Sequence, residues 1–128
     1  MSEIRENLRY TTDHEWAEKL SQPKKVKVGI TDFAQNSLGD VTFVELPEAG
    51  KSVKKGEVIG SVESVKAVSD IFAPLTGKIL SVNEALNDDP SPLNTAPFEG
   101  GWLIEMEIEN EEEWNQLLSA QAYEQHAQ

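Results

Sequence analysis

The stretch 60-GSVESVKAVSD-70 alternates valine with small or polar residues, a pattern typical of two short strands that meet at a turn. Lys66 stands in the middle of this stretch, although lysine is unfavourable in strands and Glu63 is its only obvious partner nearby. The residues beside the lysine are small or short, which allows a tight turn, and β-branched residues on either side favour stiff strands. We therefore predict a hairpin that presents Lys66 at its tip.

Similar patterns of apolar residues and glycine flank this predicted hairpin. They comprise Val53, Gly56 and Val58 before it, and Pro74, Gly77 and Ile79 after it. Gly56 lies ten residues before Lys66 and Gly77 lies eleven after it, so the two halves are arranged almost evenly. One interpretation is a pair of related β-units that face each other, with Lys66 at the apex. The pattern leaves duplication open, because turn glycines recur in any β-rich domain.

Three further segments have strand-like patterns. They are residues 24–30 (KKVKVGI), 41–46 (VTFVEL) and 102–109 (WLIEMEIE). In the last segment we expect one face to be apolar and the other to carry Leu103 and three glutamates. The expected apolar face consists of Trp102, Ile104, Met106 and Ile108.

Helical patterns cover less of the chain than the strand patterns do. They are residues 31–40, a single turn within 83–94 that a proline-rich loop follows, and one helix over 110–125. Thr31 or Asp32 can cap the first helix and Gly39 can end it, while Asn110 can cap the last. We predict a mainly β fold, a small sandwich or flattened barrel, with a C-terminal helix packed on its outside and short additional helices.

Length and charge restrict the possible functions. The 128 residues suit a single domain over residues 1–128, with its core at about 8–118 and a helical tail that frays at its end. A net charge of −12 argues against nucleic-acid binding, because such a surface repels phosphates. The negative charge has two interpretations: it keeps the protein soluble, or it attracts basic patches on partner proteins. No stretch is apolar enough for a membrane span, and the first residues do not resemble a secretory signal. We expect a cytoplasmic protein, or a mitochondrial matrix protein if a transit peptide has been removed.

The chain offers little for catalysis by its own side chains. It has no cysteine, which excludes thiol nucleophiles and cysteine zinc sites, so any thiol chemistry has to come from an attached group. Its two histidines, His14 and His126, are far apart in the sequence, and His126 lies in the tail that we expect to fray. None of the common catalytic motifs occurs. We therefore predict neither an enzyme nor a metal site.

Lys66 is the residue whose placement calls for a function. One interpretation is a solvated turn lysine of the kind that many turns carry. The other is a modified lysine, because a rigid hairpin that presents one amine is what an acylating enzyme needs in order to select one lysine among several. An activated acyl donor can compensate for the low fraction of neutral amine at pH 7.

The residues around Lys66, and segments along most of the chain, resemble the glycine cleavage H-protein family. The matching segments are VESVKA (62–67) with SD and AP-x-x-G after it, DHEW (13–16), VGITDFAQNSLGDVTFVELPE (28–48), G-x-x-V-x-x-GE (50–57), VNEAL (82–86) and 92–102, which ends in GGW. The lysine motif alone also resembles the lipoyl domains of 2-oxo acid dehydrogenases. Its combination with the other segments is specific to this family. A biotin carrier is disfavoured, since that family flanks its lysine with methionines.

The resemblance implies a lipoyl/biotinyl-type hybrid barrel-sandwich fold and a group carrier in glycine catabolism and one-carbon metabolism. It implies that Lys66 carries lipoic acid in amide linkage, attached by a lipoate-attaching enzyme. On this reading the chain carries an aminomethyl group from glycine decarboxylase to the aminomethyltransferase, and electrons to dihydrolipoamide dehydrogenase. The protein itself is not an enzyme. An alternative is a lipoyl relay protein that donates lipoate to other complexes, and a plain acidic β-domain with an unmodified Lys66 is a third reading.

The resemblance also implies roles for three acidic residues. Glu15 and Asp70 match positions that line a cleft for the aminomethyl-loaded arm, where a carboxylate can hold the protonated amine by a charge-assisted hydrogen bond. Glu63, three residues before Lys66, can be the residue that the lipoate-attaching enzyme reads. Each of the three also has a plain interpretation as a surface acid, which a chain of this composition makes common.

Overall fold

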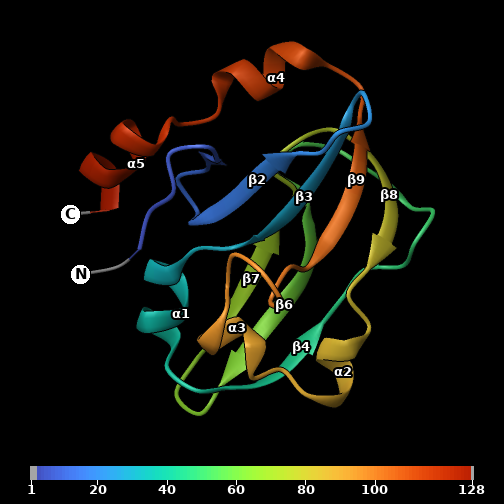
Figure 1. The fold of residues 1–128 in the computed structure, drawn as a ribbon. Coiled ribbons are helices and arrows are strands. Elements are labelled where there is room, and N and C mark those ends of the chain that lie inside the picture. Colours follow the sequence, from blue (N-terminus) through green and yellow to red (C-terminus); the bar gives the residue numbers. More distant parts are fainter. Residues whose placement is uncertain (1–2, 128) are drawn as a thin grey trace.

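Alternating apolar side chains place most of the chain in strands, and the computed structural model, which describes residues 3–127, arranges these strands in two sheets (Figure 1). The larger sheet has the strand order β1-β2-β3-β9-β8-β5, and the smaller one β4-β6-β7. The strands of the larger sheet are β1 (Arg9–Tyr10), β2 (Glu15–Lys19), β3 (Lys25–Ile30), β9 (Ile104–Ile108), β8 (Gly77–Val82) and β5 (Ser52–Val53). Those of the smaller sheet are β4 (Val41–Glu45), β6 (Val58–Ser64) and β7 (Val68–Phe72).

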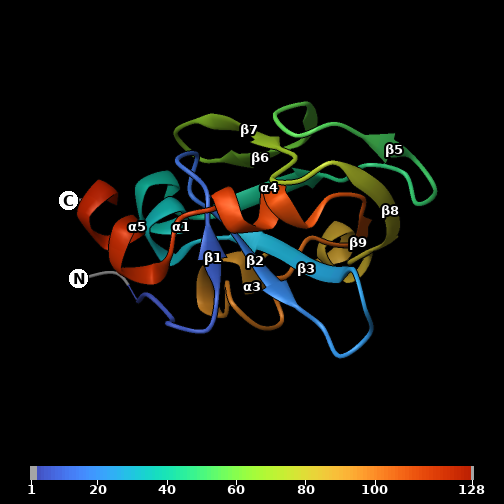
Figure 2. The ribbon, with the colours of Figure 1, turned by 90° about the horizontal axis from the view of Figure 1, so that it is seen from above.

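The mainly β barrel-sandwich prediction is confirmed. All neighbouring strands pair antiparallel, and the smaller sheet forms a layer on one side of the larger sheet (Figure 2). Val44 and Val62 of the smaller sheet share one buried cluster with the larger sheet's Val28, Ile104 and Met106. The prediction that the domain covers residues 1–128, with its core at about 8–118, stays a prediction, and residues 1, 2 and 128 lie outside the described part.

Two predictions about the apolar residues need correction. Leu103, which we expected on the outer face with the glutamates, is 1% exposed. It precedes the first residue of β9, so the alternation of that strand does not apply to it, and its N–H donates to the carbonyl of Val28 at 2.8 Å. The second prediction concerns Gly56 and Gly77, which we expected in similar places on either side of the hairpin, and they differ. Gly56 has a φ of +86° in a turn, whereas Gly77 begins β8, where a side chain would collide with the carbonyl oxygen of Glu107.

The hairpin prediction is confirmed. Strands β6 and β7 pair antiparallel from Val58↔Phe72 to Glu63↔Val68, and Lys66 lies in the connection between them. The strands that follow the two flanking glycines, β6 and β8, lie in different sheets, as facing units require.

The helices are short and lie around the sheets. They are α1 (Asp32–Leu38), α2 (Ala85–Asp88), α3 (Pro92–Thr95), α4 (Glu111–Gln116) and α5 (Ala120–Ala127). Helix α1 follows the prediction, because the Thr31 hydroxyl accepts the N–H of Ala34 as the N-cap and Gly39 ends the helix with a φ of +78°. The proline-rich loop predicted after α2 is wrong in part, since it contains α3. None of the helices among residues 3–127 combines the length and the apolar character that crossing a membrane requires.

The single helix predicted over residues 110–125 is wrong. Asn110 caps α4 as expected, but the chain is extended at Leu117 and forms a β-bridge between Leu118 and Tyr10 before α5 begins. Two backbone hydrogen bonds of 2.8 and 2.9 Å join Leu118 and Tyr10. Helix α5 then continues to Ala127 and lies on the same side of the molecule as α1 (Figures 1 and 2).

A second buried cluster holds this C-terminal segment in place. The rings of Tyr10 and Tyr123 are stacked with their centroids 4.5 Å apart, and Trp16 beside them is fully buried. The Trp16 indole N–H donates to the Pro97 carbonyl at 3.0 Å. Gly29, paired with Trp16 across β2 and β3, leaves room for the indole, because a Cβ there would lie 2.6 Å from the ring.

Candidate functional site

The turn that carries Lys66 is organised by the hydroxyl of Ser64. Its Oγ accepts the N–H of Lys66 at 3.3 Å and that of Ala67 at 3.1 Å, and the N–H of Ser64 donates to the Ala67 carbonyl at 2.8 Å. The favoured two-residue hairpin turns need positive φ at one or both turn residues, and within residues 3–127 only His14 and Lys24 among non-glycine residues have it. The Ser64 side chain thus stabilises a turn that uses ordinary backbone conformations. Sequence reasoning missed this role, although a serine directly before a short turn is a known signal.

Two hydrogen bonds fix the tip to β4 and the residue before it. The N–H of Val65 donates to the Asp40 carbonyl at 3.2 Å, and the Thr42 hydroxyl donates to the Glu63 carbonyl at 3.2 Å. Lys66 is exposed, and its Cε lies 3.5 Å from where a Cβ on Gly39 would be. Neither Lys66 nor Glu63 forms an ion pair within residues 3–127. The backbone of the tip is therefore held while the amine remains available.

A small cavity lies between the tip and α1. Its volume is about 170 Å³, and its lining consists of Asp13, His14, Phe33, Ala34, Ser37, Leu38 and Ser69. Ser69 is three residues after Lys66, and Leu38 is next to Gly39 under the lysine side chain. The cavity therefore begins within a few residues of the lysine and offers both apolar and polar contacts to a group attached there.

Glu15, the first residue of β2 in the larger sheet, has a buried carboxyl that faces the free edge of β7 in the smaller sheet. It is 2% exposed, so its interpretation as a surface acid is wrong. Its Oε1 accepts the Thr11 hydroxyl at 2.8 Å, and its Oε2 accepts the N–H of Phe72 on β7 at 3.0 Å. Burial raises the pKa of Glu15 from 4.5 to about 7, because these two hydrogen bonds offset the loss of hydration only in part and Asp13 adds repulsion. The carboxyl therefore titrates near neutral pH.

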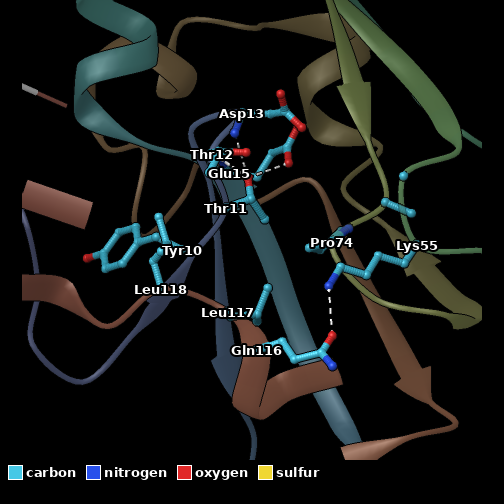
Figure 3. A pocket seen from close by; sticks show the side chains of 12 residues that line it. Tyr10, Thr11, Thr12, Asp13, Glu15, Lys55, Pro74, Gln116, Leu117 and Leu118 are labelled. Atoms are coloured by element: carbon cyan, nitrogen blue, oxygen red, sulfur yellow. Dashed lines mark hydrogen bonds between the residues drawn. The ribbon is translucent and has the colours of Figure 1, made fainter. Parts of the chain in front are cut away.

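Glu15 also borders a second cavity, of about 180 Å³, which the 10–13 segment lines in part. Figure 3 shows Glu15 and Asp13 at one end of this cavity, and Lys55 and Gln116 together at the other. The Lys55 amine donates to the Gln116 side-chain oxygen at 3.3 Å, which joins the turn before β6 to α4.

Asp70 is exposed, and its side chain shares the outer face of the smaller sheet. It pairs with Ser61, which pairs with Glu45, and directly paired residues project to the same face. Within residues 3–127 no hydrogen bond or ion pair joins Asp70 to Glu15. The two predicted cleft residues nevertheless lie along the same free edge of β7, because Glu15 binds the N–H of Phe72, two residues after Asp70.

The two histidines lie close together, although they are far apart in the sequence. Their ring centroids are 5.5 Å apart, and Nε2 of His126 lies 3.0 Å from the Thr12 carbonyl. His14 stacks on Phe33 of α1 at 4.5 Å, and its Nδ1 lies 2.7 Å from the Tyr123 hydroxyl. Burial and the neighbouring His126 lower the pKa of His14, which favours its neutral form. No group of three or more potential metal ligands occurs among residues 3–127.

The Tyr123 hydroxyl links the two walls of the cavity beside the tip. Besides His14 it contacts the hydroxyl of Thr31, the N-cap of α1, at 2.7 Å. Helix α5 thereby ties the 11–14 segment to α1. Sequence reasoning assigned no such role to α5, because the residues concerned are about a hundred positions apart along the chain.

Comparisons with known proteins agree over nearly the whole chain. The family model described as glycine cleavage H-protein matches residues 8–128. The glycine cleavage system H protein of Kocuria rhizophila is 53% identical over 125 residues, which covers 98% of each chain. That of Anaeromyxobacter sp. (strain K) is 51% identical over 121 residues, 94% of this chain and 93% of the relative. The crystal structure of a glycine cleavage system H protein from Mycobacterium marinum superposes with a TM-score of 0.82 at 41% identity, over 94% of this chain and 95% of that one.

Proposed function

The chain belongs to the glycine cleavage H-protein family, whose members are non-catalytic lipoyl carriers of the glycine cleavage system, and we propose that it carries its lipoyl group on Lys66. The observation that carries this proposal is the tip itself. Lys66 is exposed and free of ion pairs within residues 3–127, and Ser64 and Asp40 hold the backbone around it. The turn presents an accessible primary amine on a held backbone, as amide formation by another enzyme requires.

The residues around Lys66 fit a lipoyl group. The cavity of about 170 Å³ beside the tip has apolar walls from Phe33, Ala34 and Leu38, which suit an alkyl chain. When bound, the group supplies a dithiolane that alternates between disulfide and dithiol and carries the aminomethyl group. The chain's own contribution is to place the amine, to offer the cavity, and to provide no cysteine that would exchange with the dithiolane.

We assign Glu15 and Asp70 to the binding of the protonated amine of a loaded arm. Within residues 3–127 the Glu15 carboxylate accepts two hydrogen bonds, which leaves lone pairs for an ammonium group. An adjacent cation favours the ionised carboxylate, so binding of the ammonium group would lower the pKa of Glu15. From Val68 to Phe72 the edge of β7 runs roughly 13 Å, so a group attached at the tip would pass Asp70 before it reaches Glu15.

The test of this assignment is the lifetime of the loaded carrier. We expect Glu15→Gln and Asp70→Asn each to speed the release of the one-carbon unit, with Glu15→Gln having the larger effect because the buried site excludes water. Glu107→Gln, on the exposed side of β9, is the matched control. Equal release rates for Glu15→Gln, Asp70→Asn and the unchanged protein would reject the assignment.

Glu63 is our candidate for recognition by the lipoate-attaching enzyme. Its side chain is exposed, points to the outer face of the hairpin and forms no ion pair within residues 3–127. A free carboxylate near the target lysine can contact a basic residue of that enzyme. We expect Glu63→Gln to slow acylation of Lys66, and an unchanged rate would count against the role.

The partners that we propose follow from family membership. They are glycine decarboxylase, the aminomethyltransferase, dihydrolipoamide dehydrogenase and the lipoate-attaching enzyme. The net charge of −12 supports attraction to basic surfaces on these partners, and such attraction weakens with salt. The relay role in lipoate assembly and the cytoplasmic location stay predictions.

The experiment that tests the proposed attachment site is the intact mass of the chain from a host able to lipoylate it. We expect the mass of one lipoyl group in amide linkage on the unchanged protein and none on Lys66→Arg, which keeps the positive charge. Lys78→Arg is the control for a lysine in a strand away from the tip and should leave the addition in place. A lipoyl addition that persists in Lys66→Arg would overturn the assignment.

A further inference from the structure

Four exposed side chains around the attachment lysine form a continuous surface, which we name the tip platform: Phe43, Glu63, Val65 and Val68. We propose that the tip platform is the docking surface for the lipoate-attaching enzyme, and that this enzyme meets it with an apolar surface flanked by basic side chains. The inference rests on the proposed attachment of lipoate to Lys66.

The pairing of the strands places the platform on the outer face of the smaller sheet. Phe43 on β4 pairs with Glu63 on β6, which pairs with Val68 on β7, so the three side chains form one row across the sheet. Neighbouring strands are about 4.8 Å apart, which makes the row continuous. Val65 extends it onto the turn, next to Lys66.

The exposed apolar side chains of the molecule are concentrated at this place. Among residues 3–127 four large hydrophobic residues are exposed, and three of them belong to the platform: Phe43 at 54%, Val65 at 73% and Val68 at 66%. The fourth, Val58 at 48%, lies at the other end of β6. On the opposite face of the same strands Val44 and Val62 fill the core, so burial does not require apolar residues on the outer face. Three exposed apolar side chains gathered around one carboxylate, where the rest of the described surface has one, indicate an interaction site.

The charges around the platform define the partner further. Residues 38–45 and 58–72 hold β4, the two strands of the hairpin and the tip, and Lys66 is the only lysine or arginine in them. The same two ranges carry four acids, which are Asp40, Glu45, Glu63 and Asp70. The surroundings of the tip are thus acidic with a single cation, which is the amine to be acylated. A partner with basic side chains around its acyl site complements this pattern and is guided to Lys66 rather than to the lysines elsewhere.

The reach of the lysine side chain distinguishes the attaching enzyme from the other partners. The Nζ atom extends roughly 6 Å from Cα, so an enzyme that reacts at Nζ has to cover the neighbouring platform. Acylation joins Nζ to the acyl carbon of an acyl adenylate, breaks the bond from that carbon to the phosphate oxygen, and releases AMP and the proton lost by the amine. Partners that react at the far end of the attached group act farther from the backbone and need the platform less.

The test is the steady-state acylation of the unmodified chain by a purified lipoate–protein ligase with lipoate and ATP, followed by intact mass. Phe43→Thr and Val68→Thr remove apolar surface and keep a residue that is favourable in strands. Val58→Thr makes the matched change in the same sheet away from the tip. We expect Phe43→Thr to lower kcat/KM for the chain about tenfold, mainly through KM, and Val58→Thr to change it less than about twofold.

A competition measurement gives a readout that is independent of acylation. The Lys66→Arg chain, which cannot be acylated, should inhibit acylation of the unchanged chain, and Lys66→Arg with Phe43→Thr should inhibit about tenfold more weakly. Equal kcat/KM for Phe43→Thr and the unchanged chain overturns the inference, and so does an equal loss in Val58→Thr. A Phe43→Thr chain that is acylated normally but transfers aminomethyl groups slowly would assign the platform to another partner. If the unchanged chain is not acylated on Lys66 at all, the proposed function fails together with the inference.

Discussion

Glu15 allows a quantitative prediction, because ionising a buried carboxyl costs free energy that ionising it in the unfolded chain does not. Its pKa in the folded protein is about 7 against an ordinary value of 4.5. At about 1.4 kcal/mol per pH unit, this interval corresponds to about 3 kcal/mol. The carboxyl is 2% exposed, so screening by water does not reduce this cost much.

The sign of the effect follows from the raised pKa. Below pH 4.5 the carboxyl is protonated in both states and its ionisation costs nothing. As the pH rises through the folded pKa of about 7, the folded protein also loses the proton and the full cost is reached. The contribution of Glu15 to the free energy of unfolding is therefore present at low pH and lost across this window.

The change that isolates this contribution is Glu15→Gln, which keeps an oxygen acceptor for the N–H of Phe72 and removes the ionisation. Urea unfolding, followed by tryptophan fluorescence at pH 5 and pH 8, gives the free energy of unfolding of both proteins. We expect the difference between the variant and the unchanged protein to shift in favour of the variant by about 2.5 kcal/mol from pH 5 to pH 8.

Glu107→Gln is the control, because it removes a carboxylate from an exposed position on β9. Its effect on the free energy of unfolding should differ between the two pH values by less than about 0.5 kcal/mol. Stability profiles of Glu15→Gln and the unchanged protein that run parallel from pH 5 to pH 8 would refute the reasoning, since Glu15 would then not titrate in this window.

Three further predictions concern the parts that hold the site. Tyr123→Phe keeps the ring but leaves the Nδ1 of His14 without its partner, so we expect urea unfolding to show that the free energy of unfolding falls by about 1–3 kcal/mol. An unchanged free energy of unfolding would show that the hydroxyl does not hold the 11–14 segment to α1. Ser64→Ala removes the acceptor of two turn N–H groups, and hydrogen exchange at those amides should accelerate while the rest of the sheet stays protected; unchanged exchange would exclude the hydroxyl as the stabiliser of the turn. Gly29→Ala places a Cβ 2.6 Å from the Trp16 ring, so thermal unfolding should show that the free energy of unfolding falls by about 3 kcal/mol. A decrease of less than about 1 kcal/mol would mean that the indole can move.

The sequence predicted the parts of the site whose cause is local. The hairpin around Lys66 follows from alternation and small turn residues within eleven positions, and these interactions persist in the structure. Helix α1 likewise follows from a capping residue at its start and a glycine at its end. The fold class was predictable for the same reason, because strand alternation is a short-range pattern.

The parts that the sequence did not predict depend on distant contacts. The interruption of the C-terminal helix arises because Leu118 pairs with Tyr10, and no residue near Leu118 indicates this. The proximity of His14 and His126 arises because α5 contacts the 12–14 segment, through Tyr123 to His14 and through His126 to the Thr12 carbonyl. The burial of Glu15 was equally hidden, because in a chain with 23 acidic residues each acid is first expected on the surface.

The cost of burying Glu15 has a reason if the proposed function holds. A glutamine at this position would make the unliganded fold more stable above neutral pH, yet it would lack the charge to hold an ammonium group. Below about pH 7 the carboxyl of the empty site is mostly protonated, so its burial costs little there. A cation that arrives beside it favours the ionised form and supplies the interaction that burial removed. The binding free energy of the amine is then reduced by the cost of deprotonating Glu15, and this cost falls as the pH rises toward 7. The loaded arm should accordingly stay bound longer at pH 8 than at pH 6, and this dependence should disappear in Glu15→Gln.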